Sequence, residues 1–233
     1  MSTRPAETEN RLHAKRCRLP IGPVIGPMVI CAFACPHGDE CGLRGDGVKD
    51  SKLLTPQQRE TLAKTIKKYP RSLVVLTAAD LTQSMSKRTS LNEIEARAMA
   101  KAISEVVKKV GARNVKTIYV DTPDPTAAKY AARLRKYFSF PKQATLVCEH
   151  KADVNYPVVG AASILAKVTR DFEIEEIKRK LGHDFGNGYS HDERTIAFLK
   201  KHIRDEALQE FIRHKWITAK RMKTTQLDLS GFA

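Results

Sequence analysis

Two aspartates follow predicted strands and could together bind a metal ion. Asp121 comes directly after the apolar segment 116–120, and Asp153 lies shortly after the apolar segment 143–148 and before a predicted helix. In open α/β sheets ligands bind at the carboxyl ends of the strands, so we expect both side chains at one edge. Carboxylate oxygens are hard ligands that suit Mg²⁺ or Mn²⁺. On a basic chain, such a pair favours phosphodiester hydrolysis by a two-metal route.

Each aspartate also has a purely structural interpretation. Asp121 begins an Asp-Thr-Pro-Asp turn and could cap the next helix. Asp153 could be an acidic residue at a helix start, where the helix dipole favours negative charge. Two carboxylates are moreover a small ligand set for two metal ions.

A second candidate site combines thiols with a histidine. Cys31, Cys35, His37 and Cys41 are close in sequence and could bind zinc, but no Cys-x-x-Cys pair occurs. Cys31 and Cys35 share one face of a predicted strand. We therefore interpret them as buried thiols.

The charge of the chain indicates a polyanionic partner. Lys and Arg total 41 against 26 Asp and Glu, which gives a net charge of +15. Nucleic acid is the first candidate because its binding depends on neutralising phosphates; a basic surface with no such partner is the alternative. The segment 211–223 concentrates five cations around the single tryptophan, Trp216. The cations are Arg213, Lys215, Lys220, Arg221 and Lys223. A solvated helix face over a buried Trp would have the same sequence.

A glycine-rich turn carries an aromatic residue. Gly186, Asn187 and Gly188 precede Tyr189. Tyr189 could contact a base or sugar of a nucleic acid, and a plain loop is the alternative.

Length and composition restrict the class of protein. A chain of 233 residues with 42% hydrophobic residues predicts one folded domain with a small appendage. It has no apolar stretch long enough to span a membrane, and its first residues lack the apolar region of a secretory signal. Five cysteines are too few for a disulfide scaffold. We expect a reduced, monomeric protein in the cytoplasm, or in the nucleus of a eukaryote, with no membrane partner.

Strands and helices alternate along the chain, which predicts an α/β fold. Residues 1–20 show no clear period and are interpreted as a tail, and 36–48 as a loop. Capping signals at Thr55 with Gln58, Ser90 with Glu93, and Ser190 with Glu193 predict three helix starts. Further segments are strands at 23–35, 72–78, 116–120 and 143–148, and helices at 125–138 and 156–181. The predicted organisation is an atypical segment 1–20, a domain 21–172 and a helical C-terminal extension 173–233.

Several segments in order resemble one family. They are Gly22–Met28, Val48–Lys52, Leu91–Glu95, Tyr119–Asp121, Glu149–Asp153, Tyr156–Lys167, Gly186–Tyr189 and Thr195. Together they closely resemble the type 2 ribonuclease H family, ribonuclease HII, in its archaeal-like form. The resemblance covers about residues 20–222, and its run from Glu149 to Asp171 is highly specific.

The resemblance implies a ribonuclease H-like mixed sheet flanked by helices. It also implies cleavage of the RNA strand of RNA–DNA hybrids, including single ribonucleotides embedded in DNA, with Mg²⁺ or Mn²⁺. Asp121 and Asp153 match the third and fourth of four metal-binding, catalytic carboxylates. Tyr189 matches a tyrosine that stacks on the deoxyribose at the RNA-to-DNA junction. Gly22 closes the family's first motif, and Lys52 is expected near the substrate backbone.

One departure from the family affects the site directly. The family motif Asp-Glu-Ala-Gly-Arg-Gly should precede Pro23, but here the six positions are 17–22 and only Gly22 matches. Cys17 and Arg18 therefore occupy the places of two carboxylates, and an Arg would repel Mg²⁺. The preceding residues also form a poor buried strand, and Pro20 cannot donate to a sheet ladder.

Three explanations of this departure are open. The translation of the gene could be imperfect at its start, the chain could be a degenerate homologue that binds hybrids without cleaving them, or another residue such as Asp50 or Asp124 could replace a ligand. The abrupt start of the match at Gly22 favours the first.

Overall fold

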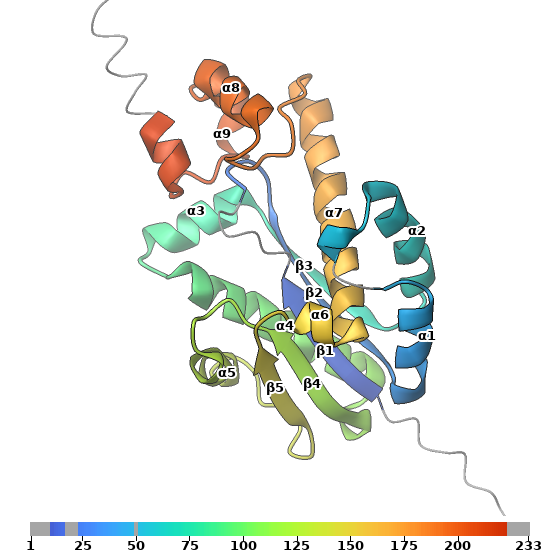
Figure 1. Cartoon of the computed structure of the whole chain (residues 1–233). Coiled ribbons are helices and arrows are strands. Elements are labelled where there is room, and N and C mark those ends of the chain that lie inside the picture. Colours follow the sequence, from blue (N-terminus) through green and yellow to red (C-terminus); the bar gives the residue numbers. More distant parts are fainter. Residues whose placement is uncertain (1–9, 17–22, 49–50, 223–233) are drawn as a thin grey trace, which may run out of the picture. The chain divides into compact units, whose positions relative to one another are not determined.

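The computed structural model describes residues 10–16, 23–48 and 51–222, and residues 10–16 only by their backbone (Figure 1). Five strands form one sheet in the order β3-β2-β1-β4-β5. Their bounds are Asn10–Arg16 for β1, Met28–Pro36 for β2, Arg71–Leu76 for β3, Val115–Asp121 for β4 and Thr145–Glu149 for β5.

The direction of the strands decides which residues meet at an edge. β1 is antiparallel to β2 but parallel to β4, where Ala14 lies opposite Val120. β4 is in turn parallel to β5, and their last residues, Asp121 and Glu149, lie opposite each other. The carboxyl ends of β1, β4 and β5 therefore share one edge of the sheet, which is the expected location of a site.

The presence of β1 corrects the sequence analysis. Residues 10–16 were interpreted as part of a tail, yet they form a strand between β2 and β4. Their sequence alternates poorly and is basic, so strand propensity alone does not select it. Pairing with a neighbour on each side supplies the backbone hydrogen bonds, and tertiary context overrides weak propensity.

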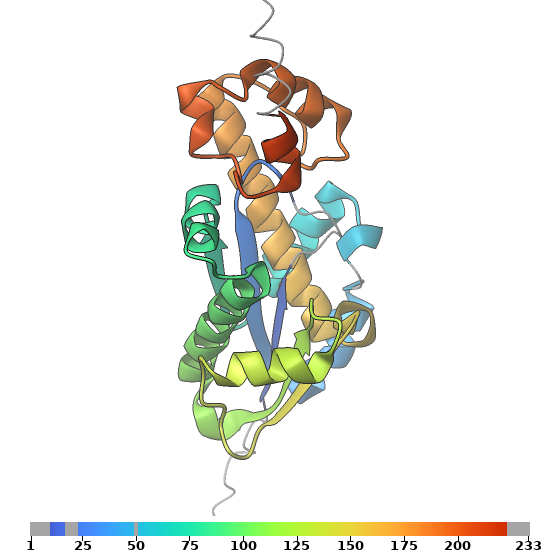
Figure 2. The same cartoon turned by 90° about the vertical axis from the view of Figure 1, so that its left-hand side faces the viewer.

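Helices make up most of the described chain outside the strands. They comprise α1 (Glu40–Gly45), α2 (Pro56–Ile66), α3 (Ala78–Ser86), α4 (Leu91–Val110), α5 (Ala127–Arg135), α6 (Ala152–Asn155), α7 (Pro157–Leu181), α8 (Glu193–His202) and α9 (Glu206–Gln209), with short 3₁₀ turns η1 (His37–Asp39), η2 (Ser51–Leu53) and η3 (Ala112–Asn114). In Figures 1 and 2, α4 lies on the opposite face of the sheet from α1, α2 and the first half of α7. Alternate residues of β2, from Val29 to Cys35, pack against the latter group. The mixed sheet flanked by helices is the predicted fold class.

The described residues separate into two compact units. One contains β1, residues 29–74 and residues 95–168, and therefore the edge with Asp121 and Glu149. The other contains residues 23–28, 75–94 and 169–222 and has its own apolar core around Ile25, Phe185, Leu199 and Ile212. The predicted boundaries at residues 20 and 172 stay predictions.

Several predicted elements are confirmed and others are wrong. The capping box of Thr55 with Gln58 begins α2, and Ser90 accepts the N–H of Glu93 at the start of α4. The predicted loop 36–48 contains η1 and α1, and α3 was missed. Asp192, and not Ser190, caps α8. Among the described residues, no helix is both long enough and apolar enough to cross a membrane.

Candidate active site

The two predicted metal ligands lie on neighbouring elements of one unit. Asp121 is the last residue of β4 and is half-buried, and Asp153 is in the first turn of α6 and is 4% exposed. Oδ1 of Asp121 accepts a hydrogen bond of 3.0 Å from the backbone N–H of Ala152, the residue before Asp153. The sheet edge thus brings together the two aspartates that the sequence analysis selected.

Glu149 is a third carboxylate at this edge that the sequence analysis did not select. It ends β5 opposite Asp121, and its Oε1 accepts a hydrogen bond of 3.0 Å from the hydroxyl of Tyr156. Burial, followed by the hydrogen bond to Glu149, raises the pKa of Tyr156 above 10.0. The signal in the sequence that could have found Glu149 is its position at the end of the strand beside β4.

The donor set suits a divalent ion by type but is incomplete in number. Carboxylate oxygens are the ligands that Mg²⁺ and Mn²⁺ prefer. Within the part of the chain that the structure describes, no group of three His, Cys, Asp or Glu side chains could hold a metal ion. Asp121 and Asp153 therefore fit one weakly held ion and fall short of a two-ion centre.

Asp124, one of the two possible replacement ligands, does not complete the set. Asp124 is buried and forms an ion pair with Arg133, and its N–H is bound by Oγ1 of Thr122 at 3.2 Å. These contacts give Asp124 a role in the turn after β4. Asp50 lies outside the described residues, as do Gly22 and the positions 17 and 18.

Lys52 is presented on a short, well-anchored turn in the same unit. It is exposed in the middle of η2. Oγ of the preceding Ser51 lies 2.8 Å from Oγ of Ser163 on α7, and Arg59 donates to the carbonyls of Ser51 and Leu54 at 3.2 and 2.7 Å. The backbone of this turn is thereby fixed while the Lys52 side chain faces solvent.

Tyr189 belongs to the other unit, where its loop is tightly held. The ring is 4% exposed and lies 4.6 Å from the guanidinium carbon of Arg170. Arg170 also donates to the carbonyl of Asn187. The carbonyl of Gly188 accepts the N–H groups of Val24 and Ile25 at 2.7 and 3.1 Å. No pattern in the sequence pointed to Arg170.

Gly188 has a left-handed backbone that this contact requires. Its φ is +78°, and a Cβ at this position would lie 2.7 Å from the carbonyl oxygen of Ile25. Only glycine allows this close approach. Thr195 completes the anchor, because its Oγ1 accepts the N–H of Gly188 at 3.0 Å and donates to the carbonyl of Phe185 at 2.7 Å.

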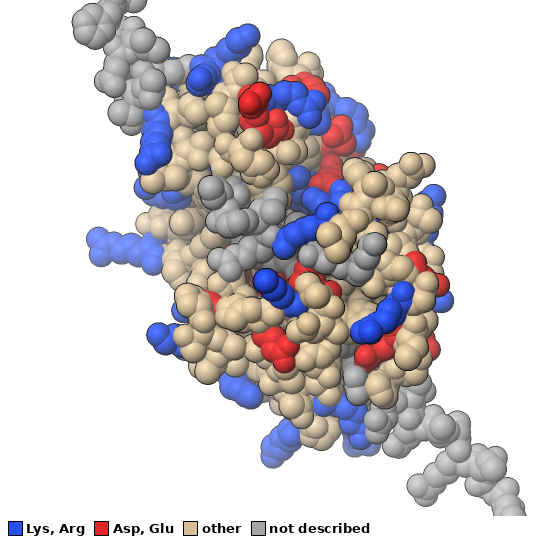
Figure 3. Space-filling model, viewed as in Figure 1, with Lys and Arg blue, Asp and Glu red and all other residues tan. Residues whose placement is uncertain are grey.

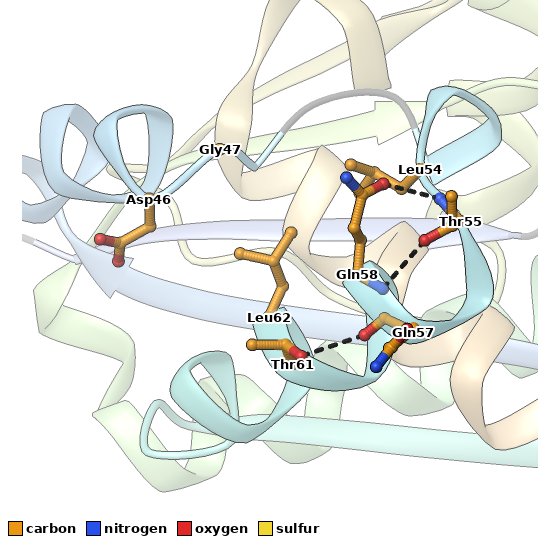
Figure 4. A pocket seen from close by; sticks show the side chains of 8 residues that line it. All are labelled: Asp46, Gly47, Leu54, Thr55, Gln57, Gln58, Thr61 and Leu62. Carbon is orange, nitrogen blue, oxygen red and sulfur yellow. Dashed lines mark hydrogen bonds between the residues drawn. The ribbon is translucent and has the colours of Figure 1, made fainter.

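A hollow of about 620 Å³ lies between the end of α1 and the start of α2 (Figure 4). Its polar groups serve the helix, because Thr55 and Gln58 form the capping box and Oγ1 of Thr61 donates to the carbonyl of Gln57. Among the described residues that line it, Asp46 is the one carboxylate. None of the predicted site residues that the structure describes lines this hollow.

The structure supports the interpretation of the cysteines but changes that of the basic segment. Cys31 and Cys35 are buried on β2, as predicted, and burial raises the pKa of Cys31 to about 12. Arg213, in contrast, is not a surface cation: it is 1% exposed and donates to the carbonyls of Gly26 and Pro27 at 2.8 and 2.5 Å. Figure 3 shows Lys and Arg side chains scattered over the drawn face and not gathered in one patch. The basic character is therefore distributed.

Comparisons with known proteins give a consistent family match. A family model described as Ribonuclease HII matches residues 21–219. Ribonuclease HII of Pyrococcus abyssi is 39% identical over 218 residues, which cover 91% of this chain and 92% of that protein. Ribonuclease HII of Archaeoglobus fulgidus is 38% identical, with 89% of this chain and 94% of that protein covered.

Solved structures give the same fold. The crystal structure of ribonuclease H2 from Pyrococcus horikoshii has a TM-score of 0.77 at 32% identity and covers 93% of this chain and 98% of that one. The ribonuclease HII in a PCNA complex from Archaeoglobus fulgidus has a TM-score of 0.74 at 35% identity, with 88% and 94% covered. Bst-RNase HIII in complex with Mn²⁺ has a TM-score of 0.81 at 18% identity, covers 94% and 70%, and supports the fold alone.

Proposed function

This chain belongs to the ribonuclease HII family, and on that premise we propose that it recognises RNA–DNA hybrids, including single ribonucleotides embedded in DNA. Enzymes of this family hydrolyse the RNA strand of RNA–DNA hybrids with divalent metal ions. The hydrolytic site is the sheet edge with Asp121 and Asp153. The observation that carries the proposal is the hydrogen bond between Asp121 and Ala152, which couples the two carboxylates.

Each remaining site residue has a proposed contact with the duplex. Lys52, exposed on its anchored turn, pairs with a backbone phosphate. Tyr189 lies against the deoxyribose that follows the ribonucleotide, and Gly22 allows close approach of the backbone to the substrate. Mg²⁺ or Mn²⁺ held by Asp121 and Asp153 would polarise the scissile phosphate and lower the pKa of a bound water.

The polypeptide as given has an incomplete site for this reaction. Two-metal hydrolysis needs enough ligands to hold two ions, one for the attacking oxygen and one for the leaving oxygen. Cys17 and Arg18 replace two of them, and no described residue adds a third ligand to Asp121 and Asp153. We therefore propose that this polypeptide binds hybrids and cleaves them very slowly or not at all.

Binding and cleavage can be separated with one set of duplexes. Fluorescence anisotropy should give tighter binding to a duplex with one embedded ribonucleotide than to the same duplex of DNA alone. Incubation with Mn²⁺ should leave the labelled strand intact on the timescale of minutes. Equal affinity for both duplexes would contradict the proposed recognition.

A further inference from the structure

The helix that carries Asp153 is too short to hold its own position. α6 has four residues and follows Lys151, which has a left-handed φ of 57°. A single helical turn is unstable in isolation, because nucleation fixes several dihedral angles for one hydrogen bond. Contacts outside α6 must therefore determine where the carboxylate of Asp153 lies.

Two carboxylates on adjacent strands hold the two ends of α6. At its start, Oδ1 of Asp121 accepts the N–H of Ala152 at 3.0 Å. At its end, Oε1 of Glu149 accepts the hydroxyl of Tyr156 at 3.0 Å, and Oε2 accepts Nδ2 of Asn155 at 3.4 Å. Asp121 and Glu149 are opposite each other in the parallel register of β4 and β5.

The tyrosine that Glu149 binds is itself fixed against the same strand as Asp121. The rings of Tyr156 and Tyr119 are 4.0 Å apart between centroids, with an interplanar angle of 32°. Tyr119 lies two residues before Asp121 on β4, so its side chain and that of Asp121 project from the same face of the strand. The N–H of Thr122 also donates to the carbonyl of Glu149 at 2.9 Å. These contacts thus fix the end of α6 relative to the backbone that carries Asp121.

We propose that Glu149 is a positioning residue for the metal site. Through Tyr156 and Asn155 it fixes the end of α6 and thereby the separation of the Asp153 and Asp121 carboxylates. This inference rests on the proposed function, because it takes these two aspartates as the metal ligands. Partners of metal ligands that orient them without touching the ion commonly change metal affinity by about 10- to 100-fold when removed.

Three substitutions separate positioning from charge. Tyr156→Phe removes only the hydroxyl, Glu149→Ala removes the acceptor, and Glu149→Gln keeps an acceptor oxygen but removes the charge. Mn²⁺ affinity is measured on the full chain by the paramagnetic broadening of amide resonances, which detects weak binding. Amide hydrogen exchange of residues 152–156 is measured on the same samples.

We expect Tyr156→Phe and Glu149→Ala each to weaken Mn²⁺ binding roughly tenfold and to speed exchange in α6. Glu149→Gln should retain most of the affinity and most of the protection. Tyr69→Phe is the matched control. Tyr69 is also half-buried, packs on an aromatic ring and hydrogen-bonds a carboxylate, Asp39, but it lies outside the proposed site. Tyr69→Phe should lower the melting temperature and leave Mn²⁺ affinity unchanged.

Three outcomes would count against the account. Unchanged Mn²⁺ affinity in Tyr156→Phe, with a loss of thermal stability like that of Tyr69→Phe, would overturn positioning and leave Glu149 as an ordinary stabilising residue. Equal losses in Glu149→Gln and Glu149→Ala would also overturn it, because charge alone would then explain the effect. No Mn²⁺ binding by the unmodified chain would contradict the proposed metal site; unchanged exchange of α6 in Tyr156→Phe would then separately overturn positioning.

Discussion

Oδ1 of Asp121 accepts a hydrogen bond from the backbone N–H of Ala152, so the side chain at the end of β4 also fixes the start of the helix that carries Asp153. The helix that follows Asp121 in the chain, which it was expected to cap, is α5, but its contact is with α6. One oxygen of Asp121 therefore has a structural role at the sheet edge where a ligand is expected.

Asp121→Asn and Asp121→Ala should separate these two roles. Asn keeps an oxygen that can accept the Ala152 N–H, whereas Ala removes it and should cost about 1 kcal/mol more in the free energy of unfolding. Both substitutions remove the charge, so calorimetry should detect no Mn²⁺ binding in either. The unmodified chain should bind Mn²⁺ weakly at a single site. Tight binding of two ions would show that the chain contains further ligands.

Gly188→Ala should loosen the loop that holds Tyr189. The substitution places a Cβ 2.7 Å from the carbonyl oxygen of Ile25 at a φ of +78°. Gly182→Ala is the control, because its φ is +66° and a Cβ there meets nothing within 4 Å. Both variants carry the left-handed strain, but Gly188→Ala should lose about 1–3 kcal/mol more in urea unfolding. Equal losses would mean that the Ile25 contact is unimportant.

Asp192→Ala should destabilise the protein in a pH-dependent way. Burial alone would raise the pKa of Asp192, but hydrogen bonds from the N–H groups of Asn187 and Arg194 and the charge of Arg194 lower it below 3.8. A lowered folded-state pKa gives stability that is present above pH 3.8 and lost as the pH falls through the folded value.

The measurement is urea unfolding of Asp192→Ala and of the unmodified chain across the acid range. The variant should lose about 1–2 kcal/mol at pH 7, and the difference should shrink toward pH 3. Thr55→Ala, which removes the cap of α2 and no ionisable group, should lose a similar amount at every pH. A pH-independent loss in Asp192→Ala would contradict the assigned cause.

The basic segment 211–223 should divide into binding and structural cations. Replacing Lys215, Lys220 and Arg221 with Ala should weaken hybrid binding and lower the slope of log affinity against log salt by up to about 2–3. Arg213→Ala should instead lower the free energy of unfolding by about 3 kcal/mol, because two buried carbonyls lose their donor. Salt-independent affinity of the unmodified chain would contradict phosphate recognition.

Sequence patterns predicted the elements that carry the site but not every strand. β4 and α7 have clear apolar patterns and lie close to the predicted ranges. β1 was not predicted, because the residues between Asn10 and Arg16 have no apolar alternation and form a strand through pairing on both sides. Missing β1 also hid that three strands end at the same edge.

Two other differences have local causes. α3 is polar along much of its length, and its signal was the capping box of Thr77 with Asp80, which a search by apolar period does not weigh. Glu149 and Tyr156 are separated by six residues, four of which form α6, so their hydrogen bond depends on where α6 lies beside β4 and β5. The register of these two strands cannot be derived from one strand alone.

β1 also changes the design of the most direct experiment. Because residues 10–16 already form the strand that precedes the missing motif, repair needs only residues 17–21, which become Asp-Glu-Ala-Gly-Arg and leave Gly22 in place. No redesign of the strand is needed. Asp121→Asn in the repaired chain is the control for cleavage that depends on the described site.

The decisive measurement is cleavage of a labelled DNA duplex with one embedded ribonucleotide, in Mg²⁺ or Mn²⁺, by the unmodified and the repaired chain. We predict no or very slow cleavage by the unmodified chain. The repaired chain should cleave at the ribonucleotide and leave a 5′-phosphate, and Asp121→Asn should abolish this activity. Full activity of the unmodified chain that Asp121→Asn abolishes would contradict the claim that Cys17 and Arg18 disable the site.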